Sequence, residues 1–518
     1  RLSRLKHPVA FGLINTKPIR TTPGVCPMSG PETNESQSEL SRRDVLRAGA
    51  GVLALAPLSQ AAGEKPGDPF LVKPYLQLGD ASRLLKAEQM VVSWQTGTDE
   101  SKWVVEFRTG RKGKWIAAGA PKIDPVVVSG IAPHWVFRAT LTGLAPGGEF
   151  EYRVRRNGNT VFASTGRARK SRSQSVRCVV MGDCGTGSPQ QKRVAFQAAR
   201  IDPDFVLIPG DLVYSNGRIS EYRSSFWPAY SPDTASPESG APLLRSVPFL
   251  GGLGQHDTGA TLDDYADGFA FYMYWSFPLN GPVGDEGSAN AFPLGNNQER
   301  RAAAFAATGD RYPRMANYSF DYGDSHWTVL DTWNPHINWN DPMLRKWLRK
   351  DLESTDATWK FVSSYLPPFN SSTAYPHTQK MRVIVDILQD TGVDIVFCGY
   401  AHSYQVTYPL RFTPTSKLDG PVRAAGHEIP GKFELDKTFD GKTKTKADGI
   451  LYITTGGGGN AGLHSPEQTD NPKTWQPFTV KYNASVNQFT DLRINDDHLT
   501  LRQVDLNGNL IDEFRVSK

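Results

Sequence analysis

Two short stretches decide the fold, VRCVVMGDCGTG at residues 176–187 and FVLIPGDLVY at residues 205–214. Each is an apolar run that ends in glycine and aspartate, so each predicts a buried strand followed by a tight turn that presents a carboxylate. Strands of this kind belong to layered α/β domains, whose ligands gather at the carboxyl ends of the strands. Asp183 and Asp211 are therefore candidate ligands of one shared site.

Two later stretches repeat the pattern, VPFLGGLGQHD at residues 247–257 and VDIVFCGYAHSY at residues 393–404. They bring histidine side chains to the same kind of strand end. Carboxylate, phenolate and imidazole groups together suit Fe(III) or a similar hard ion. The sequence thus predicts a metal site built from Asp183, Asp211, Tyr214 and His402.

The rest of the chain divides into two predicted domains. Residues 69–165 contain short runs of β-branched and aromatic residues between turn residues, which predict an all-β sandwich like that of fibronectin type III. LAPGGEFEYRV at residues 144–154 is typical of the tyrosine corner of such a sandwich. From residue 176 to residue 518, apolar strands alternate with helix-like segments, and residues 258–312 interrupt that rhythm as an insertion.

The first 62 residues predict a leader that ends in an export signal. SRRDVLR at residues 41–47 precedes a short apolar run and small residues, the parts of a twin-arginine signal peptide. We therefore expect the twin-arginine export machinery as a partner and a periplasmic or extracellular location. Residues 1–62 hold eight basic and four acidic side chains, so 50 basic and 49 acidic ones follow them. This balance gives no reason to expect nucleic acid as a partner, and no later apolar run is long enough to predict a membrane span.

The motifs resemble those of a known family. GDCG, GDLVY, GQHD, YLPPFN at residues 365–370 and GYAHSY follow one another in this order. They resemble the GDxG, GDxxY, GNH[DE], HxP and GHxH-x-Y motifs of the purple acid phosphatases, within the calcineurin-like metallophosphoesterases. The resemblance covers residues 70–518. It implies a fibronectin III-like N-terminal domain, a four-layer α/β/β/α metallophosphoesterase domain, and a secreted acid phosphatase that hydrolyses phosphate esters.

The resemblance also sorts the site residues by role. It assigns the iron-side ligands to Asp183, Asp211, Tyr214 and His402. The second-metal ligands of the family are Asn, His and His, and the matching residues of this chain are Gln255, Tyr365 and Tyr400. It implies one Fe(III) per chain and puts a second divalent ion, zinc, manganese or iron, in question. His256 matches a substrate-facing histidine, and His377 lies roughly where another substrate-contacting histidine is expected.

Three functions are compatible with this pattern. The first is hydrolysis of a small phosphoester at a single iron ion, with His256 as proton donor. The second is a mononuclear iron enzyme of other chemistry, with Gln255, Tyr365 and Tyr400 rebuilt as an organic pocket. The third is a non-catalytic homologue that binds a metal or a ligand.

Overall fold

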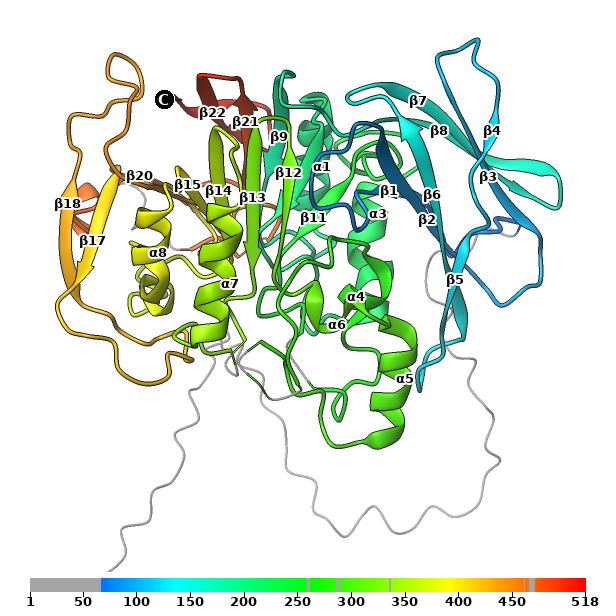
Figure 1. The fold of residues 1–518 in the computed structure, drawn as a ribbon, viewed down its shortest axis with the longest axis horizontal. Coiled ribbons are helices and arrows are strands. Elements are labelled where there is room, and N and C mark those ends of the chain that lie inside the picture. Colours follow the sequence, from blue (N-terminus) through cyan, green and yellow to red (C-terminus); the bar gives the residue numbers. More distant parts are fainter. Residues whose placement is uncertain are drawn as a thin grey trace, which may run out of the picture. The chain divides into compact units, whose positions relative to one another are not determined.

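The computed structural model describes residues 67–518 except 259–260, 286–287, 289, 335–336, 461 and 465–470. The predicted leader and signal peptide at residues 1–62 lie outside the described residues. Among the helices of the described part, none has the length and apolar character that crossing a bilayer requires. Two all-strand sheets come first in the chain, and an α/β domain follows (Figure 1).

The N-terminal domain consists of two four-stranded antiparallel sheets, in the orders β1-β2-β6-β5 and β4-β3-β7-β8. Their strands are β1 (Val72–Gln77), β2 (Glu88–Thr96), β3 (Trp103–Thr109), β4 (Ile116–Ala117), β5 (Lys122–Val126), β6 (His134–Leu144), β7 (Glu149–Arg156) and β8 (Asn159–Arg167). Alternate residues of β3 face the interior, as expected where one face of a sheet is buried. There the rings of Trp94 and Phe137 stack with centroids 5.0 Å apart. The predicted all-β N-terminal domain is confirmed.

The expected tyrosine corner is not formed as predicted. Tyr152 is fully buried, but its hydroxyl donates to the backbone carbonyl of Arg245 (2.8 Å), far from its own sandwich in sequence. A buried phenol requires an acceptor, and the following domain supplies it. Tyr75 in β1 makes a similar bond to the carbonyl of Tyr274 (2.7 Å). These two phenols therefore tie the sandwich to the α/β domain.

The α/β domain contains two mixed sheets that pack face to face. The first has the order β11-β10-β9-β21-β22-β23 and the second β12-β13-β14-β15-β19-β16-β20. The strands of the first are β9 (Val176–Val180), β10 (Phe205–Ile208), β11 (Phe249–Gly251), β21 (Gln488–Ile494), β22 (His498–Asp505) and β23 (Leu510–Ser517). Those of the second are β12 (Tyr318–Tyr322), β13 (Ser325–Leu330), β14 (Trp359–Ser364), β15 (Ile395–Cys398), β16 (Tyr404–Thr407), β19 (Leu451–Thr455) and β20 (Thr479–Asn483). Phe205 of the first sheet packs against Trp327 of the second with ring centroids 5.4 Å apart.

Helices cover the outer faces of both sheets, which confirms the four-layer α/β/β/α architecture. α1 (Pro189–Arg200) begins at Ser188, whose side chain accepts a hydrogen bond from the Gln191 amide as an N-cap. α7 (Pro342–Glu353) and α8 (Val385–Asp390) lie over the second sheet (Figure 1). The remaining elements are α2 (Ile219–Glu221), η2 (Tyr222–Phe226), α3 (Trp227–Tyr230), α4 (Ala270–Tyr274), α5 (Gln298–Thr308), α6 (Arg311–Arg314), η3 (Lys380–Ile384), η5 (Pro472–Thr474), and the β17 (Leu410–Pro414)–β18 (Gly431–Leu435) hairpin.

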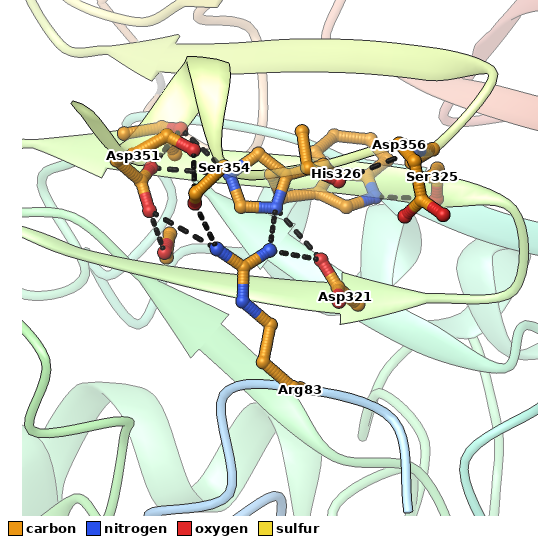
Figure 2. A network of polar contacts seen from close by, with 12 residues as sticks. Arg83, Asp321, Ser325, His326, Asp351, Ser354 and Asp356 are labelled. Carbon is orange, nitrogen blue, oxygen red and sulfur yellow. Dashed lines mark hydrogen bonds and ion pairs between the residues drawn. The ribbon is translucent and has the colours of Figure 1, made fainter. Parts of the chain in front are cut away.

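A buried ionic network joins the loop after β1 to the edge of the second sheet (Figure 2). The ring nitrogens of His326 lie 2.7 Å from Asp321 Oδ1 and 3.1 Å from Asp351 Oδ2. Arg83 reaches in from the loop and donates to Asp321 Oδ1 (3.1 Å) and to Ser354 Oγ (2.7 Å). Burial alone lowers the pKa of His326, but the hydrogen bonds to the two aspartates outweigh it and raise the pKa. The fold therefore favours the imidazolium form here.

Candidate metal centre

Five strands deliver the candidate residues to one place. Asp183 follows β9, Asp211 follows β10, Gln255 and His256 follow β11, Tyr365 follows β14, and Tyr400 and His402 follow β15. Asp183 and Asp211 have left-handed backbones, with φ of 58° and 54°, which let the chain turn sharply after each strand. Both aspartates are fully buried. The predicted convergence at strand ends is therefore present.

Three donor atoms stand at the corners of a nearly regular triangle. Asp183 Oδ1 lies 3.5 Å from Tyr214 Oη and 3.5 Å from His402 Nε2, and the last two atoms are 3.4 Å apart. A point equidistant from the three lies about 2.0 Å from each, which is the usual bond length from a metal to protein oxygen or nitrogen. His402 Nδ1 donates to the carbonyl of Gly462 (2.6 Å), so Nε2 is the nitrogen with a free lone pair. Asp183, Tyr214 and His402 therefore fit a metal ion.

Asp211 takes part differently. Its Oδ1 accepts from the backbone amide of His256 (2.9 Å), and its Oδ2 accepts from the hydroxyl of Tyr365 (2.8 Å). Within the part of the chain that the structure describes, no three His, Cys, Asp or Glu side chains form a metal-holding group. The donor set is mixed instead, since one corner of the triangle is a phenol and the second carboxylate is engaged by Tyr365.

The electrostatics of the site call for a cation. Burial, followed by the charge of Asp183, raises the pKa of Asp211 to about 6. Burial and the two carboxylates also raise the pKa of Tyr214, so its phenol keeps its proton while no cation is near. The ion pair that the structure gives these carboxylates is the 3.5 Å contact of Asp183 with His402. Buried carboxylates are costly unless a positive charge offsets them, and a metal ion supplies that charge.

The three altered positions do not point donors at an open metal site. The ring of Tyr365 lies against the backbones of Gly210 and Gly399, where a Cβ on Gly210 would come within 2.4 Å of it. The ring of Tyr400 stacks on Tyr375, with centroids 4.1 Å apart. Gln255 Nε2 lies 3.0 Å from His256 Nε2. The second-metal side is thus filled by packed rings and by an amide that contacts a histidine.

The two predicted substrate-contacting histidines have different fates. His256 packs on Tyr214 with ring centroids 4.5 Å apart, and its Nδ1 donates to the carbonyl of Ser215 (2.9 Å). Nε2 is therefore the nitrogen that can accept or carry a further proton. His377 is 68% exposed and pairs with Glu428. The structure brings His256 to the site and places His377 on an exposed loop, where a carboxylate compensates it.

Sequence reasoning did not single out Tyr375 or assign a place to His464. The His464 ring lies parallel to that of His402 with centroids 5.0 Å apart, and its Nδ1 is 3.3 Å from Ser372 Oγ. Tyr375 packs edge-on against His464 at 5.2 Å. Both belong to loops without regular strand patterns, so only their chemistry, an aromatic residue near a glycine-rich strand end, gives a signal.

Comparison with known proteins places the two domains. Residues 176–404 match the family model of the calcineurin-like phosphoesterases, and residues 76–173 match that of the purple acid phosphatase N-terminal domain. Purple acid phosphatase 23 of Arabidopsis thaliana is 27% identical over 227 residues, which cover 39% of this chain and 42% of that protein. Purple acid phosphatase 15 of the same plant is 24% identical over 383 residues, 68% of this chain and 58% of that protein. This chain thus spans roughly two to three fifths of these relatives.

A solved structure shares the fold. A purple acid phosphatase isolated from yellow lupin (Lupinus luteus) seeds superposes with a TM-score of 0.58 at 18% sequence identity, over 86% of this chain and 74% of that one. At this identity the match concerns the fold alone. It covers more of this chain than either family model, so the sandwich and the α/β domain occur together in both proteins.

Proposed function

Since this chain belongs to the purple acid phosphatases within the calcineurin-like metallophosphoesterases, we propose that it hydrolyses phosphate esters with a single iron ion. Asp183, Asp211, Tyr214 and His402 are its ligands in this proposal. One observation carries the mononuclear assignment: the Tyr365 hydroxyl lies 2.8 Å from Asp211 Oδ2, the oxygen that a second ion would need. A neutral phenol donating to that oxygen takes the place of a second cation.

The ion and the chain contribute separately to the reaction. An iron ion, when bound, polarises a phosphoryl oxygen and lowers the pKa of a water molecule. The buried carboxylates of Asp183 and Asp211 hold the ion at the strand ends. His256 is fixed by its bond to the Ser215 carbonyl, so that Nε2 is the atom that passes a proton to the leaving oxygen. Tyr365 keeps Asp211 oriented through its hydroxyl.

Metal analysis of the purified chain tests this proposal. We expect about one iron per chain, a visible tyrosinate-to-iron absorption band, and hydrolysis of an aryl phosphate that is lost in Asp211→Asn. Two metal ions per chain would refute the mononuclear assignment. One ion without cleavage of any ester in a broad panel would favour the second function, iron chemistry other than phosphoester hydrolysis, for which the packed phenols of Tyr365 and Tyr400 are the supporting observation.

Export is part of the proposal. The Arg42-Arg43 pair with the apolar run after it supports transport by the twin-arginine route to the periplasm or the cell exterior. That route carries proteins that have already folded, which fits a chain that must take up its metal before it leaves the cytoplasm.

A further inference from the structure

Seven rings surround the two buried carboxylates, and we call them the aromatic collar. Its members are Tyr214, His256, Tyr365, Tyr375, Tyr400, His402 and His464. Neighbouring ring centroids are 4.1 to 5.4 Å apart along the path from Tyr365 through Tyr400, Tyr375 and His464 to His402. The contact of 3.4 Å between Tyr214 Oη and His402 Nε2 continues the path to Tyr214 and His256. What approaches the carboxylates from this side therefore meets aromatic rings.

The collar contains no lysine or arginine, and this decides which charge the site accepts. In the mononuclear site, a trivalent ion is balanced by the Asp183 and Asp211 carboxylates and the Tyr214 phenolate, so the centre as a whole is neutral. A second divalent ion would add two positive charges, but Tyr365 stands on that side. A phosphate monoester carries two negative charges at mildly alkaline pH, whereas a diester carries one. Removing a charge from water is costly without a compensating charge, so a neutral centre favours the monoanion.

The outer part of the collar offers flat apolar surface. Tyr375 is half-buried and stacks on Tyr400, which is 7% exposed. Trp333, also half-buried, contacts the same ring with centroids 5.8 Å apart. Aromatic rings bind planar groups by stacking, with little regard to what else the group carries. The partly exposed rings on both sides of Tyr400 therefore suit a planar substituent beside the phosphoryl group.

We propose that the substrates are monoanionic phosphodiesters that carry a planar aromatic group, with this group bound against Tyr375 beside the side that Tyr365 closes to a second ion. The inference rests on the proposed function. In the reaction, the P–O bond to one ester group breaks, water supplies the new P–O bond, and one proton passes to the leaving oxygen. The product is a phosphate monoester, whose second negative charge makes it the weaker ligand of a neutral centre.

Binding of non-hydrolysable anions to the iron-loaded chain tests the inference without relying on turnover. Isothermal titration at mildly alkaline pH would compare diphenylphosphinate, a monoanion with rings, dimethylphosphinate, a monoanion without rings, and phenylphosphonate, a dianion with a ring. We expect diphenylphosphinate to bind more tightly than both others. In Tyr375→Leu its advantage over dimethylphosphinate should fall by roughly two- to ten-fold, whereas Tyr375→Phe, which keeps the ring, should retain it.

Each result has a clear consequence. Tighter binding of phenylphosphonate than of diphenylphosphinate overturns the charge argument, and equal binding of the two phosphinates overturns the stacking argument. The ranking in the unaltered chain decides this even if Tyr375→Leu does not fold. Metal content measured on the same samples separates the two levels: a count other than one iron per chain defeats the proposed function, while one iron with the wrong ranking defeats only the substrate assignment.

Discussion

Tyr365→Phe removes the single hydroxyl that stands at the second-metal side, and its effect follows from the structure. That hydroxyl donates to Asp211 Oδ2 at 2.8 Å, and both residues are fully buried. A hydrogen bond to a charged group contributes about 1.5–3 kcal/mol to stability. The ring itself stays packed against Gly210 and Gly399, so the substitution creates no cavity. We expect the metal-free variant to lose about 1.5–3 kcal/mol of unfolding free energy.

A matched control is available in the same hydrophobic cluster. Tyr452 is also buried, 2% exposed, but among the described residues its hydroxyl has no hydrogen-bond partner. Removing an unsatisfied buried hydroxyl costs little or is favourable, because the unfolded chain loses a hydrated group and the folded chain loses no bond. Tyr452→Phe should therefore be neutral or slightly stabilising.

The measurement is equilibrium unfolding in urea, after removal of metal, followed by far-UV circular dichroism. It belongs at a pH well above 6, since burial and Asp183 raise the pKa of Asp211 to about 6 and the bond is strongest when that carboxylate is ionised. A lower midpoint with an unchanged slope reports a loss of stability without a change in the surface exposed on unfolding. If Tyr365→Phe costs no more than Tyr452→Phe, the hydroxyl is not bound to an ionised Asp211 and the mononuclear argument loses its basis.

Three further predictions concern other parts of the chain. Because the pKa of His326 is raised in the folded state, its stabilising effect is complete below its unfolded pKa of about 6.5 and is lost as the pH rises through the folded value; the stability gap between the native chain and His326→Gln should narrow over that rise, and a gap that widens contradicts this, with His498→Gln as a surface control. Tyr214→Phe should abolish the visible absorption band of the iron-loaded chain, and a band of unchanged intensity would exclude this phenol as a ligand. Replacing Arg42 and Arg43 by lysine should leave the protein in the cytoplasm, as followed by cell fractionation, and continued export would rule out the twin-arginine route.

The strand-end residues could be predicted from the sequence because their chemistry follows from local rules. A buried apolar run that ends in Gly-Asp fixes both the strand and the position of the carboxylate, and Asp183 and Tyr214 meet as that pattern predicts. His377 lacked such a pattern, since it follows no strand directly and its loop places it beside Glu428. The bond of Tyr152 to Arg245 was also beyond prediction, because it depends on how the sandwich meets a loop 93 residues later in the sequence.

The backbone at Tyr400 explains how the second-metal side can change while the iron side stays intact. Tyr400 adopts a left-handed conformation with φ of 69°, which is unfavourable for a bulky side chain by about 1–3 kcal/mol. Its amide donates to Asp183 Oδ2 at 2.9 Å, and this bond requires the conformation but not the side chain. A phenol can therefore replace an imidazole at residue 400 without disturbing Asp183. The amide of His256 holds Asp211 Oδ1 in the same way. Because backbone groups orient both aspartates, changes in the neighbouring side chains alter the number of ions and the charge of the site before they alter its shape.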